Sequence, residues 1–230
     1  MSAPLLRVHN LSWTPPDHDA PLWSGVTFEL GSGQRLALEG ESGSGKSTLL
    51  RAIIGLLPGS TGQVYWRGQP LSPDTIRSVR RQLVYLHQRP APLATTLGQE
   101  LALARHYADF RPDDTPPGLD EDAQRQLLDL LGLGDLRDHH PFDRLSPGQQ
   151  QRLALVRALT LKPRALLLDE PTASLDPERR DLVEALLLRY LNDDPTRALI
   201  WISHSRQQRQ RLATRTLSIH RWRPPASTSP

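Results

Sequence analysis

The order of apolar and polar positions near the start of the chain indicates two half-exposed strands. Residues 5–13 and 21–30 each mix apolar with polar positions, and the turn-rich segment 14–19 separates them. Strands joined by so short a connection usually pair with each other in opposite directions. We therefore expect an antiparallel pair at the edge of a sheet.

The following apolar runs alternate between strand and helix lengths, which predicts an α/β fold with a mostly parallel sheet and helices on both of its faces. The run 72–82 is expected to be a helix with Pro73 at its first helical position. Strands are predicted at 35–39, 63–67, 83–86, 165–168, 197–203 and 216–220, and further helices at 47–54, 146–161, 177–191 and 205–214.

The middle of the chain departs from this alternation, because it contains helical patterns without strands. Residues 95–107 and 120–133 have apolar positions at helical spacing, and a proline-broken connection lies between them at 111–118. We therefore expect a helical insertion at about 90–145, forming with the next helix a subdomain at about 90–160. Residues 1–222 are predicted to form one domain, and 223–230 a disordered tail.

Composition narrows the range of functions. The chain has 230 residues and no cysteine, which excludes disulfides, thiolate zinc sites and a thiol nucleophile. Its 28 Lys+Arg residues outnumber 25 Asp+Glu residues by only three, so charge gives no reason to expect a nucleic-acid partner. We expect no signal peptide and no membrane span, because no run of eighteen apolar residues occurs.

The segment after the predicted strand 35–39 fits the phosphate-binding P-loop, G-x-x-x-x-G-K-[ST]. Glycines let the backbone turn its N–H groups toward phosphate oxygens, and the following helix adds a positive dipole end. A lysine then contacts the β- and γ-phosphates, and a serine hydroxyl contacts Mg²⁺. The predicted nucleotide-binding residues are Gly40, Glu41, Ser42, Gly43, Ser44, Gly45, Lys46, Ser47 and Thr48.

A second chemical signal follows the apolar strand 165–168, whose carboxyl end carries Asp169 and Glu170. Open α/β sheets place ligands at the carboxyl ends of their strands. Asp169 is therefore expected to hold Mg²⁺ beside the P-loop, and Glu170 to orient or deprotonate an attacking water. Alone, the pair would be interpreted as a solvated acidic turn; together with a P-loop that interpretation is weaker.

The segment Leu145-Ser146-Pro147-Gly148-Gln149 completes a set of six motifs. Their order along the chain is typical of one family. The chain resembles the ATP-binding subunits of ABC transporters over nearly its full length. The motifs are the P-loop, a Q-loop glutamine at Gln88, the signature at 145–149, the Walker B run at 165–170, a D-loop at 174–176 and a switch histidine at His204.

The resemblance implies an ABC-type ATPase that binds ATP and Mg²⁺. Gln88 would contact Mg²⁺ and the water, and His204 the γ-phosphate; seen alone, they would be interpreted as a loop amide and a helix-capping histidine. It implies a sandwich homodimer in which the signature residues Ser146, Gly148 and Gln149 of one subunit meet ATP held by the other. It also implies an integral membrane permease that holds the ATPase at the cytoplasmic face, docked between core and insertion.

Two positions depart from the family pattern. Pro147 replaces a glycine of the signature, but it falls at the first helical position, where proline is tolerated. Ser146 is a suitable N-cap and forms an S-x-x-Q capping box with Gln149, so the helix should be preserved. The aromatic residue that stacks on adenine is also absent from its usual place, where Pro15 stands. Trp13 either reaches the base or packs in the edge strand, and the sequence favours neither.

Other features carry less information. His139 and His140 have no further spaced ligands, so we interpret them as solvated rather than metal-binding. Arg206, Arg209, Arg211 and Arg215 are predicted to form a solvated helix face.

The alternative function is a soluble, non-transport ABC ATPase of the metallocluster-assembly type, since such proteins are also single units. Within the transporters, the segments 80–85 and 200–204 look similar to small ATPases of putative iron or metal export systems. The substrate and its direction of transport depend on the permease, which this sequence does not contain.

Overall fold

The computed structural model describes residues 3–109 and 117–223. The proline-broken connection expected at 111–118 and the disordered tail expected at 223–230 lie mostly outside these residues. The division into one domain over residues 1–222 stays a prediction.

Five parallel strands form the central sheet, in the order β6-β7-β8-β3-β9. Each strand joins neighbours that are distant in sequence, as helical crossovers require. The strands span Leu83–Leu86 (β6), Ala165–Asp169 (β7), Ala198–Ile202 (β8), Arg35–Glu39 (β3) and Arg215–Ser218 (β9). All five predicted parallel strands are confirmed, although β9 ends earlier than expected because a 3₁₀ helix, Ile219–Trp222, follows it.

The antiparallel strands form a second sheet, in the order β2-β1-β4-β5. The predicted pairing of the first two strands is confirmed, but its expected place at the edge of the main sheet is wrong. β1 pairs on its other side with β4, fifty residues later, so both its edges are used within this sheet. The strands span Leu6–Trp13 (β1), Trp23–Leu30 (β2), Thr61–Trp66 (β4) and Gln69–Pro70 (β5).

The predicted helices are present, with one clear difference at the start of α2. Ser72 and Thr75 exchange hydrogen bonds in a turn, so α2 begins after them at Ile76 rather than at Pro73. The helices span Lys46–Ile53 (α1), Ile76–Gln82 (α2), Leu97–Asp109 (α3), Glu121–Leu130 (α4), Pro147–Thr160 (α5), Pro177–Asn192 (α6) and Arg206–Leu212 (α7).

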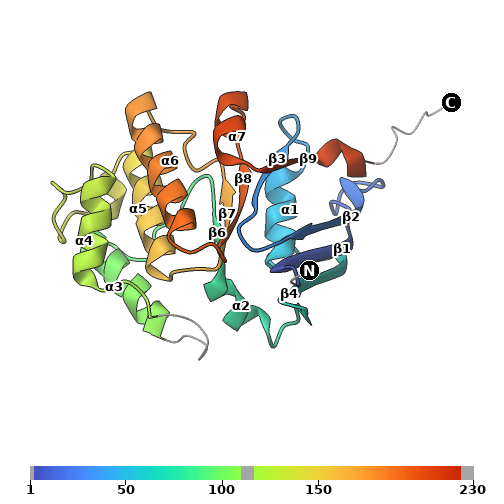
Figure 1. Cartoon of the computed structure of the whole chain (residues 1–230), viewed down its shortest axis with the longest axis horizontal. Coiled ribbons are helices and arrows are strands. Elements are labelled where there is room, and N and C mark those ends of the chain that lie inside the picture. Colours follow the sequence, from blue (N-terminus) through green and yellow to red (C-terminus); the bar gives the residue numbers. More distant parts are fainter. Residues whose placement is uncertain (1–2, 110–116, 224–230) are drawn as a thin grey trace.

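Two apolar cores lie on opposite faces of the parallel sheet. One joins α1 and the antiparallel sheet to one face, and the other joins α5 and α6 to the opposite face. Strand β7 serves both, because Leu167 packs in the first core and its neighbours Leu166 and Leu168 pack in the second. In Figure 1 the helices α3 and α4 lie at one end of the molecule and the antiparallel strands at the other.

Candidate active site

Four neighbouring strands of the parallel sheet end at the same edge and deliver the candidate residues there. β3 leads into the P-loop, β6 is followed by His87 and Gln88, β7 ends at Asp169, and β8 is followed by Ser203 and His204. Because the strands are parallel, their carboxyl ends meet at one edge of the sheet. The topology therefore brings together residues that are up to 160 positions apart.

The P-loop turns sharply into α1 and folds around its own lysine. Gly45, with φ 89°, occupies a left-handed conformation at the N-cap of α1, and a Cβ there would lie 2.9 Å from the Trp23 ring. The Lys46 ammonium donates to the carbonyls of Gly40 at 2.9 Å and Glu41 at 2.8 Å. Burial lowers the pKa of the Lys46 ammonium. The negative charges of Glu170 and Asp169 oppose this shift.

The other P-loop residues frame this turn. Ser44 is fully buried and its hydroxyl donates to the Glu41 carbonyl at 2.7 Å, which closes the loop on itself. Glu41 and Ser42 are exposed at the rim, and Thr48 lies half-buried in α1. The loop therefore presents its backbone at the start of a helix, as phosphate binding requires.

Ser47 and Asp169 form a pair of oxygen donors beside the P-loop. The Ser47 hydroxyl donates to Oδ1 of Asp169 at 2.9 Å, and the Tyr85 hydroxyl donates to Oδ2 at 3.0 Å. Burial, and then the charge of Asp169, raises the pKa of Tyr85, so that this hydroxyl remains a donor. A hydroxyl and a carboxylate are hard oxygen ligands, so the pair fits Mg²⁺.

Glu170 lies between Gln88 and His204. Nε2 of Gln88 donates to Oε2 of Glu170 at 3.1 Å, and Nε2 of His204 lies 2.7 Å from Oε1. The Glu170 backbone has φ 49°, a left-handed conformation that directs it away from the line of β7. The alternative of a helix-capping histidine is wrong, because Ser205, not His204, caps α7.

The signature segment forms the predicted helix start. Ser146 Oγ accepts the N–H of Gln149 at 3.2 Å, and the Gln149 side chain accepts the Ser146 N–H at 2.8 Å. Pro147 occupies the first helical position, so the capping box is confirmed. Gly148 lies against the D-loop, where an added Cβ would come within 3.0 Å of the Ser174 carbonyl oxygen. The signature and the D-loop are therefore in contact.

A buried glutamine that the sequence analysis missed joins three of these segments. The Gln151 amide donates to the carbonyl oxygens of Gln88 at 3.0 Å and Glu170 at 3.1 Å. Its oxygen accepts the Ser174 N–H at 3.4 Å. Gln151 thus connects α5 to the Q-loop, the end of Walker B and the D-loop.

Trp13 packs within the antiparallel sheet. Its indole N–H donates to the Pro58 carbonyl at 3.0 Å, and its ring lies 6.5 Å from that of Trp23. These contacts favour packing within the sheet, although β1 is paired on both sides and is not the expected edge strand. Stacking on adenine stays a prediction.

The solvated helix face predicted from four arginines is correct only in part: Arg206 and Arg211 are exposed on α7, Arg209 is partly buried, and Arg215 is exposed but lies in β9. Arg209 donates to the Ser203 carbonyl at 2.7 Å, and Arg211 binds Glu184 through two nitrogens at 3.0 Å each. His139 is exposed and His140 partly buried. The described residues contain no cluster of three metal-ligating side chains, and the interpretation of the two histidines as solvated stays a prediction.

Known proteins resemble this chain in sequence and in fold. The family model described as "ABC transporter" matches residues 23–173. The energy-coupling factor transporter ATP-binding protein EcfA1 of Levilactobacillus brevis is 31% identical over 207 residues, covering 89% of this chain and 71% of that protein. The sulfate/thiosulfate import ATP-binding protein CysA of Methylococcus capsulatus is 35% identical, covering 85% of this chain and 55% of that one.

A putative ABC transporter ATP-binding protein of Bifidobacterium longum is 31% identical, but this chain spans only 29% of its length. The chain thus spans 29% and 55% of the length of two of these relatives and 71% of the length of EcfA1. Among solved structures, an ATP-binding subunit of an ABC transporter has a TM-score of 0.77 and 27% identity, covering 93% of this chain and 85% of that one.

The dimeric ATP-binding cassette MJ0796, in a post-hydrolysis state with ADP and Pi, has the same TM-score, 25% identity and 93% coverage of both chains. Across the described ranges 3–109 and 117–223, no helix is both long and apolar enough to cross a membrane. The family match and the shared fold together show that the chain belongs to the ATP-binding proteins of the ABC transporter family.

Proposed function

We propose that the chain is the ATP-hydrolysing motor subunit of an ABC transporter. The observation that carries this proposal is the meeting of Lys46, the Ser47–Asp169 pair and the Glu170–His204 pair at one edge of the parallel sheet. A phosphate-binding cation, a pair of magnesium ligands and a general base next to a histidine are the parts that phosphoryl transfer to water requires.

Lys46 and the P-loop would bind the β- and γ-phosphates of ATP. The two carbonyls that now accept from Lys46 lie in the same loop, so its ammonium can turn to phosphate oxygens while the loop stays folded. Ser47, Asp169 and Gln88 are proposed to hold Mg²⁺, which neutralises charge on the phosphate oxygens when bound. Tyr85 would keep the Asp169 carboxylate in a fixed orientation.

Glu170 is proposed as the group that orients and deprotonates the attacking water. Both of its carboxylate oxygens are engaged, one by Gln88 and one by His204. Each carboxylate oxygen keeps a second lone pair that can accept a hydrogen bond from water. His204 would have to leave Glu170 to reach the γ-phosphate, which is the contact that the family resemblance implies.

The signature residues Ser146, Gly148 and Gln149 are proposed to complete the site of a second copy in an ATP-sandwich homodimer. Their helix presents a positive dipole end and the backbone N–H of Gly148, which suit a phosphate. The neighbour MJ0796 is dimeric, which supports this assembly.

We propose further that a separate integral membrane permease holds the ATPase at the cytoplasmic face of the membrane. The named relatives are subunits of transporters, which favours transport over the metallocluster-assembly alternative. Metal export stays a prediction, since the reported relatives are named for sulfate/thiosulfate import or for an energy-coupling factor transporter. No nucleic-acid partner is proposed.

The experiment is a pull-down of Glu170→Gln with ATP from detergent-solubilised membranes. Loss of the base should trap an ATP-bound dimer together with its partner. Glu178→Gln is the matched control, because Glu178 is an exposed glutamate with a side chain 79% accessible.

Recovery of a polytopic membrane protein with Glu170→Gln but not with Glu178→Gln would support the transporter proposal. Recovery of soluble partners alone, despite a stable ATP-bound dimer, would overturn it in favour of the non-transport alternative. If Glu170→Gln hydrolyses ATP at the normal rate, the assignment of the base is wrong.

A further inference from the structure

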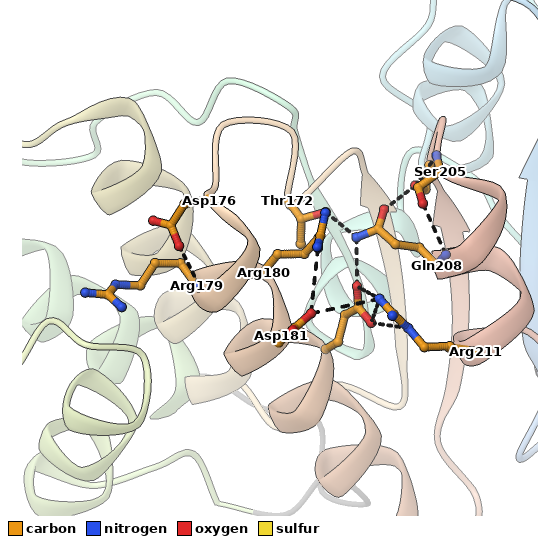
Figure 2. A network of polar contacts seen from close by, with 10 residues as sticks. Thr172, Asp176, Arg179, Arg180, Asp181, Ser205, Gln208 and Arg211 are labelled. Atoms are coloured by element: carbon orange, nitrogen blue, oxygen red, sulfur yellow. Dashed lines mark hydrogen bonds and ion pairs between the residues drawn. The ribbon is translucent and has the colours of Figure 1, made fainter.

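A buried amide network lies directly behind the switch histidine. Gln208 of α7 reaches toward Thr172, which follows Glu170, and toward α6 (Figure 2). Its Nε2 donates to Thr172 Oγ1 at 2.9 Å and to Glu184 Oε1 at 2.8 Å. Its Oε1 accepts the Ser203 hydroxyl at 2.5 Å. Gln208 is only 4% exposed.

These hydrogen bonds engage both polar atoms of the Gln208 side-chain amide. A glutamine side chain has two N–H donors and one carbonyl oxygen, and here both donors and the oxygen have partners inside the protein. Glu184, 5% exposed, is itself held by Arg211 through two nitrogens (Figure 2). A buried polar network that is fully satisfied fixes one arrangement of its members.

The network holds both neighbours of His204. Ser203 binds Gln208 through its side chain, and its hydroxyl also accepts the N–H of Ser205 at 3.0 Å. Ser205 in turn accepts the backbone N–H of Gln208 at 3.3 Å. Both neighbours of the histidine therefore bond to Gln208, Ser203 to its side chain and Ser205 to its backbone, while His204 itself is exposed.

The network also shares a wall with the candidate site. A pocket of about 340 Å³ is lined by Glu170 and His204 together with Thr172, Ser203 and Gln208 of the network. A displacement of Gln208 would therefore move the loop carrying His204 relative to the segment carrying Glu170.

We propose that Gln208 is a positioning residue that sets His204 against Glu170 by fastening the switch loop to Thr172 and Glu184. This inference rests on the proposed function for its catalytic consequence, although the placement of His204 can be measured without catalysis. The Gln208 side chain bonds to Ser203, Thr172 and Glu184 and not to Glu170, so its proposed effect on Glu170 and His204 passes through the loop.

The first variant is Gln208→Leu, which keeps the volume but removes every polar contact. It should lower kcat at least about tenfold, because three buried groups lose their partner, while KM for ATP changes less than about twofold, since the P-loop is untouched. Gln207→Leu is the matched control, because Gln207 is the exposed neighbour on the same helix.

The second variant is Gln208→Glu, which keeps the shape and sets a carboxylate against Glu184. The charged groups around position 208 are Arg180, Asp181 and Glu184 of α6, Arg209 and Arg211 of α7, and Glu170 and His204 across the pocket. Two adjoining carboxylates can share one proton at lower pH, and the shared proton restores a hydrogen bond between positions 208 and 184. Turnover of Gln208→Glu relative to wild type should therefore rise as pH falls from about 8 to 6.

The double variant Gln208→Glu/Glu184→Gln restores the pairing with donor and acceptor exchanged. It should recover turnover to within about threefold of wild type and lose the added pH dependence. This rescue keeps the proposal testable even if Gln208→Leu fails to fold.

The readout that does not depend on ATP is the imidazole NMR signal of His204, assigned by its disappearance in His204→Ala. In Gln208→Leu and in Gln208→Glu at pH 8 it should move toward the signal of an exposed histidine such as His139. It should stay in place in Gln207→Leu and return in the double variant.

A lower melting temperature in Gln208→Leu and Gln208→Glu, with an unmoved His204 signal and normal kcat, would overturn the proposal and leave Gln208 with a stabilising role alone. If wild-type protein does not hydrolyse ATP, the proposed function fails, and the His204 signal still decides whether Gln208 positions the loop.

Discussion

The Ser146 hydroxyl is proposed to do two things at once, and two substitutions can separate them. A hydroxyl has one hydrogen to donate and two lone pairs to accept. In α5 it accepts the Gln149 N–H at 3.2 Å, which uses a lone pair and leaves its hydrogen for a phosphate oxygen of the partner's ATP. Ser146→Ala removes both functions. Ser146→Asp keeps the acceptor and replaces the donor with negative charge.

The structure sets the size of the first effect. Loss of a serine N-cap costs about 0.5–2 kcal/mol. The 3.2 Å bond is long, and the reciprocal bond from the Ser146 N–H to Gln149 survives substitution, so we expect the lower end, roughly 0.5–1 kcal/mol. For a chain of this size Ser146→Ala should then melt about 1–4 °C below wild type. Ser146→Asp should melt at the wild-type temperature or slightly above, because aspartate caps well and favours a helix N-terminus.

The second effect is measured as ATP-driven dimerisation in the Glu170→Gln background, by size-exclusion chromatography with light scattering. Ser146→Ala should weaken the dimer, and Ser146→Asp should abolish it through repulsion of the phosphate. If Ser146→Asp melts as low as Ser146→Ala, the capping argument is wrong. If it dimerises with ATP as the serine protein does, the hydroxyl does not face a phosphate.

Three further predictions concern other parts of the chain. Pro147→Gly should change ATPase turnover only a few-fold, on the order of 1 kcal/mol; a gain above roughly a hundred-fold would mean that the proline makes the site degenerate. Gln151→Leu should lower the free energy of unfolding in urea by about 2–5 kcal/mol, because two carbonyls and an N–H lose their hydrogen-bond partner. Gln210→Leu, at an exposed position, should leave the free energy of unfolding unchanged. Equal losses in the two variants would refute the role of these hydrogen bonds. The pKa of Asp194 lies below its usual value of 3.8, and the hydrogen bond from the Thr196 hydroxyl is the largest cause. Thr196→Val should therefore lower stability at pH 7. That stability exists above the usual pKa and is lost as pH falls through the lower folded value, so urea midpoints of variant and wild type should converge in acid.

Short segments that determine their own conformation could be predicted from the sequence. The strand, P-loop and helix at 35–54 follow one another without interruption, and each depends on residues close by. The capping box of Ser146 and Gln149 likewise needs only four consecutive residues. These local features also indicated most of the candidate site, because Asp169 directly follows a predicted strand and Lys46 directly precedes a predicted helix.

Competing local contacts and distant pairings were harder to predict. Ser72 and Thr75 satisfy each other's hydrogen bonds in a turn, so Pro73 lies in that turn rather than in α2. The second sheet depends on the pairing of β1 with β4, for example Val8 opposite Val64. No pattern within either strand specifies that partner.

The buried glutamines left no signal that pattern analysis could use. Gln151 and Gln208 each stand in a polar stretch of sequence, and a polar residue in such a stretch is usually exposed. Only the folded structure shows that each has three partners from other segments. A polar side chain on the inward face of a helix would have been the signal, once the helix phase was known.

Strand β7 interlocks with both cores, because Leu167 packs on one face of the sheet and Leu166 and Leu168 on the other. Sliding it by one residue would turn every apolar side chain to the wrong face, and sliding it by less would strain both cores together. We therefore expect β7, with Asp169 and Glu170 at its end, to keep its position during the proposed ATPase cycle, while the loops and helices that approach it move.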